Sequence, residues 1–205
     1  MPPVGDPGKP TVTNEELSLL VRALAFAAHK HRDQRRKGAE RSPYINHPIA
    51  LVNVLVNEAD VTDSEVIATA LLHDTIEDTE TTGDEIEAQF GARIRVLVEA
   101  VTDDKALDKA ERKALQIAKA ADLPKQAKLV KLADKICNLR DIVDNPPDNW
   151  PLERRQAYFE WARQVIDGLR GCHPVLEAVF DAAYARRPGS RQPAESAAGS
   201  EKDQQ

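Results

Sequence analysis

The sequence has little cysteine and lacks long apolar runs. Its 205 residues include two cysteines, Cys137 and Cys172, which excludes a framework of several disulfides and a cysteine-rich zinc site. No apolar run approaches the roughly 18 residues needed to cross a membrane. The first residues also lack a basic segment followed by an apolar one, the pattern of a secretory signal. We therefore expect a cytoplasmic protein.

Acidic residues outnumber basic ones. The chain has 28 Lys and Arg residues against 34 Asp and Glu, which gives a formal net charge of −6. Broad nucleic-acid binding needs a basic face, so we do not expect a nucleic-acid partner. A small anionic substrate is compatible with this charge, because a metal ion and a few local cations can reverse its sign inside one pocket.

Composition divides the chain into three parts. Hydrophobic residues make up 41% of the sequence and charged residues 30%, a balance typical of a globular domain with a core. We expect this domain at residues 13–187. Residues 1–12 are rich in proline and glycine and resemble a flexible leader, and residues 188–205 have the polar composition of a disordered tail.

Helix-start signals recur along the central part. A small polar residue precedes Glu by three positions at four places, the pattern of a capping box: Thr13 and Glu16, Thr62 and Glu65, Thr82 and Glu85, and Asp108 and Glu111. Proline stands where a first helical turn would begin, at Pro48, Pro124, Pro151 and Pro174. No segment alternates as a strand does. We predict an all-α bundle of about eight to ten helices, including residues 14–32, 48–58, 63–76, 83–89, 92–102, 109–120, 124–143, 151–170 and 174–186.

Ionisable residues interrupt the apolar pattern in the predicted helix 63–76. His73 and Asp74 each continue a stripe that carries apolar residues at helical spacing upstream, and Glu77 and Asp78 follow one turn later. If that face stays inward, these groups need partners, because an unpaired buried charge is costly. A divalent cation is a suitable partner for a histidine and several carboxylates.

Two further segments supply similar groups. Asp134 lies beside the apolar stripe of the helix predicted at 124–143, and Asn138 follows it by four residues. His47 precedes a helix that is apolar nearly all round. Taken singly, each of these is explained as well by a helix cap or a solvated charge. Together with His73 and Asp74 they offer two imidazoles and two carboxylates, and helical bundles build metal sites from such sets.

These motifs carry a family resemblance that covers roughly residues 15–185. The chain resembles the HD-domain hydrolases of the RelA/SpoT family, and most of all the stand-alone small alarmone hydrolases that include the animal SpoT homologue. The matching segments are Tyr44-Ile45-Asn46-His47-Pro48, Leu71-Leu72-His73-Asp74-Thr75-Ile76-Glu77-Asp78-Thr79, Lys131-Leu132-Ala133-Asp134-Lys135, Asn138-Leu139-Arg140, Gln89-Phe90-Gly91-Ala92 and Val101-Thr102-Asp103-Asp104-Lys105.

The resemblance implies a reaction and a metal. Such enzymes hydrolyse (p)ppGpp, guanosine alarmones with a 3′-diphosphate, to GDP or GTP and pyrophosphate. The family ion is Mn²⁺, one per chain, although the nitrogen and oxygen ligands also fit Fe²⁺ or Co²⁺. By position the ligands would be His47, His73, Asp74 and Asp134. Glu77 would act as general base and Asp78 would position the water or act as an acid.

The resemblance also implies substrate contacts. Residues 30–41 hold six Lys or Arg in twelve, which a solvated helix end would also explain. Within them, Arg36 matches a residue that stacks on guanine and Lys37 one that binds phosphate. The other expected contacts are Tyr44, Asn138 and Arg140, with Lys109, Arg112 and Lys113 toward the distal phosphates.

The same residues are compatible with two further functions. The metal site would also suit a phosphatase acting on NADPH or another nucleoside phosphate, and a catalytically silent alarmone-binding module is a third hypothesis. The sequence does not indicate the oligomeric state. We expect structural roles for the remaining conspicuous residues, namely His29, His31, His173, Cys137, Cys172, Trp150, Tyr158, Phe159 and Trp161.

Overall fold

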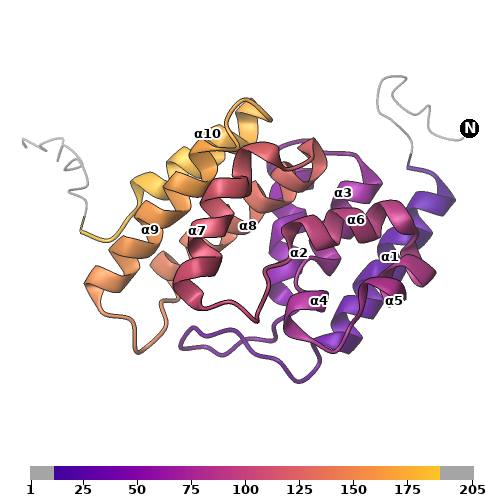
Figure 1. Ribbon diagram of the computed structural model, residues 1–205, viewed down its shortest axis with the longest axis horizontal. Coiled ribbons are helices and arrows are strands. Elements are labelled where there is room, and N and C mark those ends of the chain that lie inside the picture. Colours follow the sequence, from indigo (N-terminus) through magenta and orange to yellow (C-terminus); the bar gives the residue numbers. More distant parts are fainter. Residues whose placement is uncertain (1–11, 190–205) are drawn as a thin grey trace, which may run out of the picture.

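The computed structural model describes residues 12–189, and within that range the chain is helical apart from one isolated bridge between Arg35 and Pro43 and the connecting loops. The predicted all-α fold is confirmed (Figure 1). The proposed leader and tail fall almost wholly on residues 1–11 and 190–205, outside the described part, and stay predictions. The helices are α1 (Asn14–Lys30), α2 (Asn46–Asn53), a π-helix (Val54–Glu58), α3 (Ser64–Leu72), α4 (Thr75–Asp78), α5 (Gly83–Phe90), α6 (Ala92–Val101), α7 (Lys109–Lys119), a 3₁₀ turn (Ala120–Asp122), α8 (Lys125–Asp144), α9 (Leu152–Asp167) and α10 (Pro174–Ala185).

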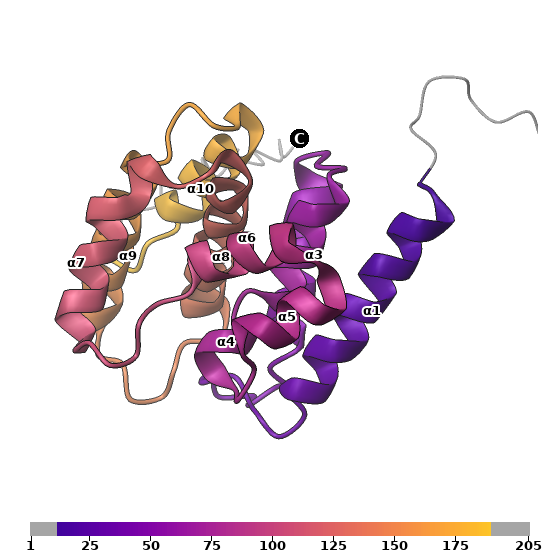
Figure 2. The same cartoon turned by 45° about the vertical axis from the view of Figure 1, so that its right-hand side comes forward.

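Helix α8 is the central element of the bundle. It contacts α2, α3 and α6 from the N-terminal half and α9 and α10 from the C-terminal half (Figures 1 and 2). Leu132 and Ile136 on α8 are fully buried with Phe159 of α9 and Phe180 of α10. Burying apolar surface of this kind is the dominant favourable contribution to folding. Residues on α8 are therefore held by both halves of the molecule.

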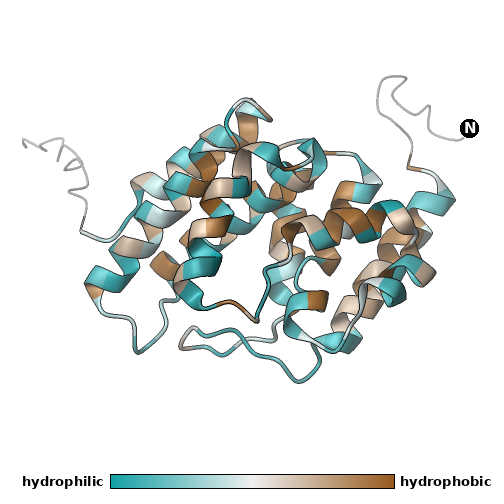
Figure 3. Ribbon diagram, in the orientation of Figure 1, coloured by the Kyte–Doolittle hydropathy of each residue, from teal (hydrophilic) through white to brown (hydrophobic). Residues whose placement is uncertain are grey.

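A second apolar cluster joins the N-terminal helices. Ala23 of α1, Leu72 of α3, Ile86 of α5 and Val98 of α6 pack together and are fully buried. Hydropathy colouring shows brown apolar patches on the helices amid polar teal surfaces (Figure 3). This amphipathic pattern fixes which side of each helix turns inward. It thereby holds α3 beside α2.

The helix caps follow the predicted signals with one exception. Thr13 and Glu16 form a complete capping box, and Thr82 and Asp108 accept hydrogen bonds from the predicted partners' backbone N–H groups. The prediction that Thr62 caps the third helix is wrong. Asp63 caps it instead, because its carboxylate accepts from two backbone N–H groups at the start of α3.

The chain also breaks where the sequence predicted one continuous helix over 63–76. Helix α3 ends at Leu72 and the short α4 begins at Thr75, so His73 and Asp74 lie between two helices. The hydroxyl of Thr75 donates to the carbonyl of Leu72 at 2.7 Å, competing with a regular helical pattern. The break places His73 and Asp74 at a junction, so they do not continue the α3 ladder.

Candidate active site

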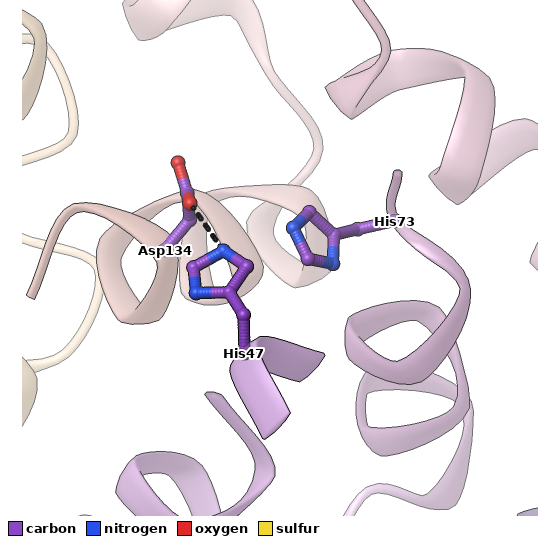
Figure 4. A group of neighbouring side chains, drawn as sticks. All are labelled: His47, His73 and Asp134. Carbon is purple, nitrogen blue, oxygen red and sulfur yellow. Dashed lines mark ion pairs between the residues drawn. The ribbon is translucent and has the colours of Figure 1, made fainter. Parts of the chain in front are cut away.

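Three elements bring His47, His73 and Asp134 together. His47 lies in the first turn of α2, His73 follows α3, and Asp134 is on α8 (Figure 4). Each offers a ligand atom within 4.8 Å of the others. His47 Nε2 is 3.3 Å from Asp134 Oδ1, and the two imidazole ring centroids are 5.3 Å apart. These separations leave the three groups converging on one point.

The surroundings of the two histidines fit a cation at that point. His73 Nδ1 bonds the carbonyl of Ala70 at 2.9 Å, which leaves Nε2 as the lone-pair nitrogen. His73 Nε2 is buried without a hydrogen-bond partner and faces Asp74 Oδ2 at 2.9 Å, while His47 faces Asp134 with its Nε2. Burial lowers the pKa of His47 and favours the neutral form, which is the form that binds metals. The residues present therefore fit a divalent ion.

Asp74 lies beside this group. Its Oδ2 is 2.9 Å from His73 Nε2 and accepts a hydrogen bond from the hydroxyl of Tyr44. Burial alone would raise the pKa of Asp74, but the neighbouring His73 holds that pKa below its usual range. For His73, burial lowers the pKa and the charge of Asp74 more than offsets this, so the pKa is raised. A metal ion between these two groups would supply the positive charge that a proton on His73 otherwise supplies.

Asp134 is fixed by its own helix. Lys135 Nζ donates to Oδ2 at 2.9 Å and Asn138 Nδ2 donates to Oδ1 at 2.5 Å. Burial would raise the pKa of Asp134, but Lys135 and His47 hold it well below the ordinary value. Asp134 is therefore an ionised, oriented carboxylate. Asn138 reaches it because the two lie four residues apart on one helical face.

The acidic pair lies on α4, next to the group of three. Asp103 donates its backbone N–H to Glu77 Oε2 at 3.1 Å. Asp78 accepts from Gln34 Nε2 at 3.0 Å and forms an ion pair with Lys105 at 2.5 Å. Burial, followed by the charge of Asp74, raises the pKa of Glu77 to about 7. A carboxyl poised near neutral pH suits proton transfer.

Connected cavities surround these residues. The first, about 270 Å³, is lined by all of the predicted ligands and by both acids. A second, about 510 Å³, opens beside it. The two share a set of lining residues that includes Arg36, Lys37, Tyr44, Asp78, Asn138 and Tyr158. An anion bound in the larger cavity would therefore contact Arg36 and Lys37 while lying next to the acids of the first cavity.

The cations of α7 border a third cavity of about 270 Å³. Lys109, Arg112 and Lys113 line it, and it shares Lys37 and Glu77 with the first cavity. Lys113 Nζ lies 4.6 Å from the ring centroid of Trp161. Burial and neighbouring cations lower the pKa of Lys109 and of Lys113. Crowded cations of this kind are relieved by a bound anion.

Arg140 is the one expected contact that the structure does not bring to these cavities. Its guanidinium forms a bidentate pair with Glu58, at 2.7 and 2.8 Å, and it lines none of the three spaces. The reason is helical geometry. Arg140 follows Asn138 by two residues, and residues two apart point to different sides of a helix.

Sequence reasoning missed several residues of the site. Trp150, Tyr158 and Trp161 were expected only to pack; they do pack against the core, but they also line cavity walls. Phe159 is fully buried, as expected. Lys135 is buried, with Nζ 4.5 Å from the ring centroid of Trp161, and was not predicted. A charged residue next to the apolar stripe of α8 was the feature of the sequence that could have indicated its burial.

Comparison with known proteins fits this geometry. The model of the HD domain matches residues 23–160. The chain belongs to the HD-domain family. HD domains are metal-dependent hydrolases, and the predicted membership is confirmed. Among residues 12–189, no helix combines the length and apolar character needed to cross a membrane.

Relatives of this HD-domain protein are similar along nearly their whole length. The human guanosine-3′,5′-bis(diphosphate) 3′-pyrophosphohydrolase MESH1 is 53% identical over 172 residues, covering 84% of this chain and 96% of the human one. The Drosophila melanogaster MESH1 is 48% identical over 168 residues, covering 82% and 94%. A solved metazoan SpoT orthologue, described as hydrolysing ppGpp, superposes with a TM-score of 0.82 at 45% identity, covering 87% and 99%.

Proposed function

We propose that this chain is a Mn²⁺-dependent 3′-pyrophosphohydrolase that converts (p)ppGpp to GDP or GTP and pyrophosphate. One observation carries the proposal: a single cavity is lined by two buried histidines, two partly buried carboxylates and an acid whose pKa is about 7. The MESH1 relatives support the substrate, because their names state this activity and they match more than four fifths of the chain. The cytoplasmic location stays a prediction.

His47, His73, Asp74 and Asp134 would hold the ion. Ligand atoms of His47, His73 and Asp134 lie within 4.8 Å of one another, and Asp74 contacts His73. Nitrogen and oxygen donors in this mixture suit Mn²⁺. When bound, a divalent ion supplies positive charge that stabilises the attacked phosphoryl group and makes water more acidic.

Glu77 acts as the general base of the proposed reaction. It takes a proton from water as the water oxygen bonds to the phosphorus attached to the 3′-oxygen. The bond between that phosphorus and the 3′-oxygen breaks, pyrophosphate leaves, and the 3′-oxygen gains a proton. Asp78, on the same α4 turn and held by Gln34 and Lys105, positions the water, and solvent supplies the proton to the 3′-oxygen.

Arg36 and Lys37 would hold the nucleotide. The guanidinium of Arg36 lies 5.6 Å from the ring centroid of Tyr44 and donates to Asn138 Oδ1 at 3.1 Å. It therefore has a fixed planar face available for a purine. Lys37 lines all three cavities, where it would meet phosphate. Lys109 and Lys113 on α7 would bind the distal phosphates.

Substrate comparison across a metal series tests the proposal. Purified protein is incubated with ppGpp, pppGpp or NADPH in Mn²⁺, Mg²⁺, Co²⁺ or no added metal, and the products are separated. We expect pyrophosphate and GDP from ppGpp, fastest with Mn²⁺. Rapid release of phosphate from NADPH with no turnover of ppGpp would replace this function by the phosphatase alternative. Binding without turnover of either compound would indicate the silent module.

A further inference from the structure

A buried histidine outside the metal-binding group is linked to the acidic pair. His31 directly follows α1, and its side chain is buried, with 2% of the residue exposed. Its Nδ1 lies 2.6 Å from Gln34 Oε1, and Gln34 Nε2 donates to Asp78 Oδ2 at 3.0 Å. Two side chains thus connect the end of α1 to a carboxylate on α4.

The chemistry of the three groups fixes the direction of this link. An ionised Asp78 can only accept hydrogen bonds, so Gln34 must present its NH₂ group there. The carbonyl oxygen of Gln34 then faces His31 and can only accept. Nδ1 of His31 must therefore carry the hydrogen. The link His31 to Gln34 to Asp78 is ordered, with each group donating to the next.

The same imidazole supports a second site carboxylate. The His31 ring packs on the ring of Tyr44, with centroids 4.8 Å apart and planes at 35°. The hydroxyl of Tyr44 donates to Asp74. Backbone bonds hold the three together, since Gln34 donates to the carbonyl of His31 at 2.9 Å and Tyr44 donates to that of Gln34 at 3.0 Å.

Packing alone does not account for a histidine at this position. His31 Nε2 is buried without a hydrogen-bond partner, which is unfavourable. An apolar ring of similar size would fill the same space without that cost. What such a ring lacks is the Nδ1–H donor that orders Gln34. The donor is the property that this position requires.

We propose that His31 and Gln34 are positioning residues that orient the carboxylate of Asp78 for the hydrolytic step. The proposal rests on the proposed function, because it assigns Asp78 a role there. His31 lines none of the three cavities, and Gln34 lines only the larger one. Fixing Asp78 lets Lys105 bond its other oxygen, so that both carboxylate oxygens have defined partners. Residues of this kind typically affect rate more than substrate binding.

Steady-state kinetics of four variants test the role. His31→Phe keeps a ring and removes the donor. Gln34→Met removes the side-chain amide, both its NH₂ and its carbonyl oxygen. His31→Asn restores a donor close to the Nδ1 position. His29→Asn is the matched control, because His29 lies two residues away in the last turn of α1 and is exposed. With ppGpp and Mn²⁺, we expect kcat to fall on the order of tenfold in His31→Phe and Gln34→Met, with KM within about twofold. His31→Asn recovers most of the rate and His29→Asn loses none.

Coupling to Asp78 separates positioning from a general structural role. In an Asp78→Ala background, adding His31→Phe or Gln34→Met should lower kcat by less than about twofold, because the group they orient is gone. A full tenfold further loss in that background, or no recovery by His31→Asn, would overturn the proposal.

A measurement without substrate distinguishes failure of this link from failure of the proposed function. Nitrogen-15 NMR of the nucleotide-free protein should show the Nδ1–H tautomer for His31 and a shifted Gln34 side-chain amide in His31→Phe. If the protein hydrolyses no ppGpp, the proposed function fails, and the tautomer still decides whether the link exists. Finding the Nε2–H tautomer would overturn the link.

Discussion

The backbone N–H of Asp103 donates to Glu77 Oε2 at 3.1 Å and joins two segments that lie 26 residues apart in the sequence. Asp103 belongs to the loop between α6 and α7, whereas Glu77 is on the single-turn α4. Gln116 of α7 donates to the carboxylate of Asp103 at 2.6 Å and fixes that loop. Glu77 is therefore aimed at the cavity by a loop that α7 holds in place.

The first prediction concerns the rate of hydrolysis in Glu77→Gln. If Glu77 accepts the proton from water, the amide cannot replace it, and kcat should fall on the order of 10²- to 10⁴-fold. KM for ppGpp should change by less than about threefold, because the substituted side chain has nearly the same shape. Steady-state assays with Mn²⁺ measure both constants. A variant that keeps more than half of the wild-type kcat would remove Glu77 from its assigned role.

The second prediction concerns stability against pH in metal-free protein. The folded pKa of Glu77, about 7, exceeds the ordinary value of 4.5, so its neutral form contributes stability that is complete below pH 4.5 and lost as pH rises through 7. Glu77→Gln mimics the neutral form. We expect equal stability near pH 4, and a variant more stable by about 1–2 kcal/mol at pH 8, after discounting for partial exposure.

Urea unfolding with a chelator present, at pH 4 and pH 8, measures this difference. Glu87→Gln is a useful control, because that residue is on α5 and away from the lining of the first cavity. If Glu77→Gln were less stable than wild type at pH 8, the ionised Glu77 side chain would not destabilise the folded protein, and this explanation of its raised pKa would be wrong.

The third prediction concerns metal binding. An ion that binds only the folded state raises stability by about 2.7 kcal/mol when its concentration is 100 times Kd. Mn²⁺ should therefore raise the Tm of wild type by several degrees. Asp134→Asn should abolish most of that increase, because it removes the charge on which the two imidazoles converge. An equal Mn²⁺-induced increase in both proteins would place the metal elsewhere.

The fourth prediction separates Arg36 from Arg140. Both carry the same charge, and both were expected to contact substrate. Arg36 lines the cavities, whereas Arg140 is bound to Glu58 outside them. Arg36→Gln should raise KM for ppGpp about tenfold or more, and Arg140→Gln should leave KM within about twofold while lowering Tm. Equal increases in KM would mean that Arg140 reaches the nucleotide after all.

The convergence of His47, His73 and Asp134 was predictable from their combination on periodic helices, although none of the three was decisive alone. Asp134 stands beside an apolar stripe on α8, and that stripe is buried as its spacing predicted. His47 opens a helix with buried residues on its inner face. When these apolar faces are buried, His47 and Asp134 beside them are brought close together. Helical periodicity therefore predicted most of the fold and the three residues at the centre of the site.

What the sequence did not reveal depends on contacts between distant segments. The break between α3 and α4 follows a side-chain bond from Thr75, and helical periodicity does not record it. The link from His31 to Asp78 needs the loop after α1 to meet α4. Arg140 was misplaced because a linear motif does not show that Asn138, two residues earlier, faces another side of α8.

The most direct test of the account is the identity of the products from ppGpp. Wild-type protein with Mn²⁺ should yield GDP and pyrophosphate in equal amounts, and in ¹⁸O-labelled water the label should appear in pyrophosphate, because water attacks phosphorus. Glu77→Gln should give the same products far more slowly. Release of single phosphates without pyrophosphate, or label in the 3′-hydroxyl of GDP, would contradict the account.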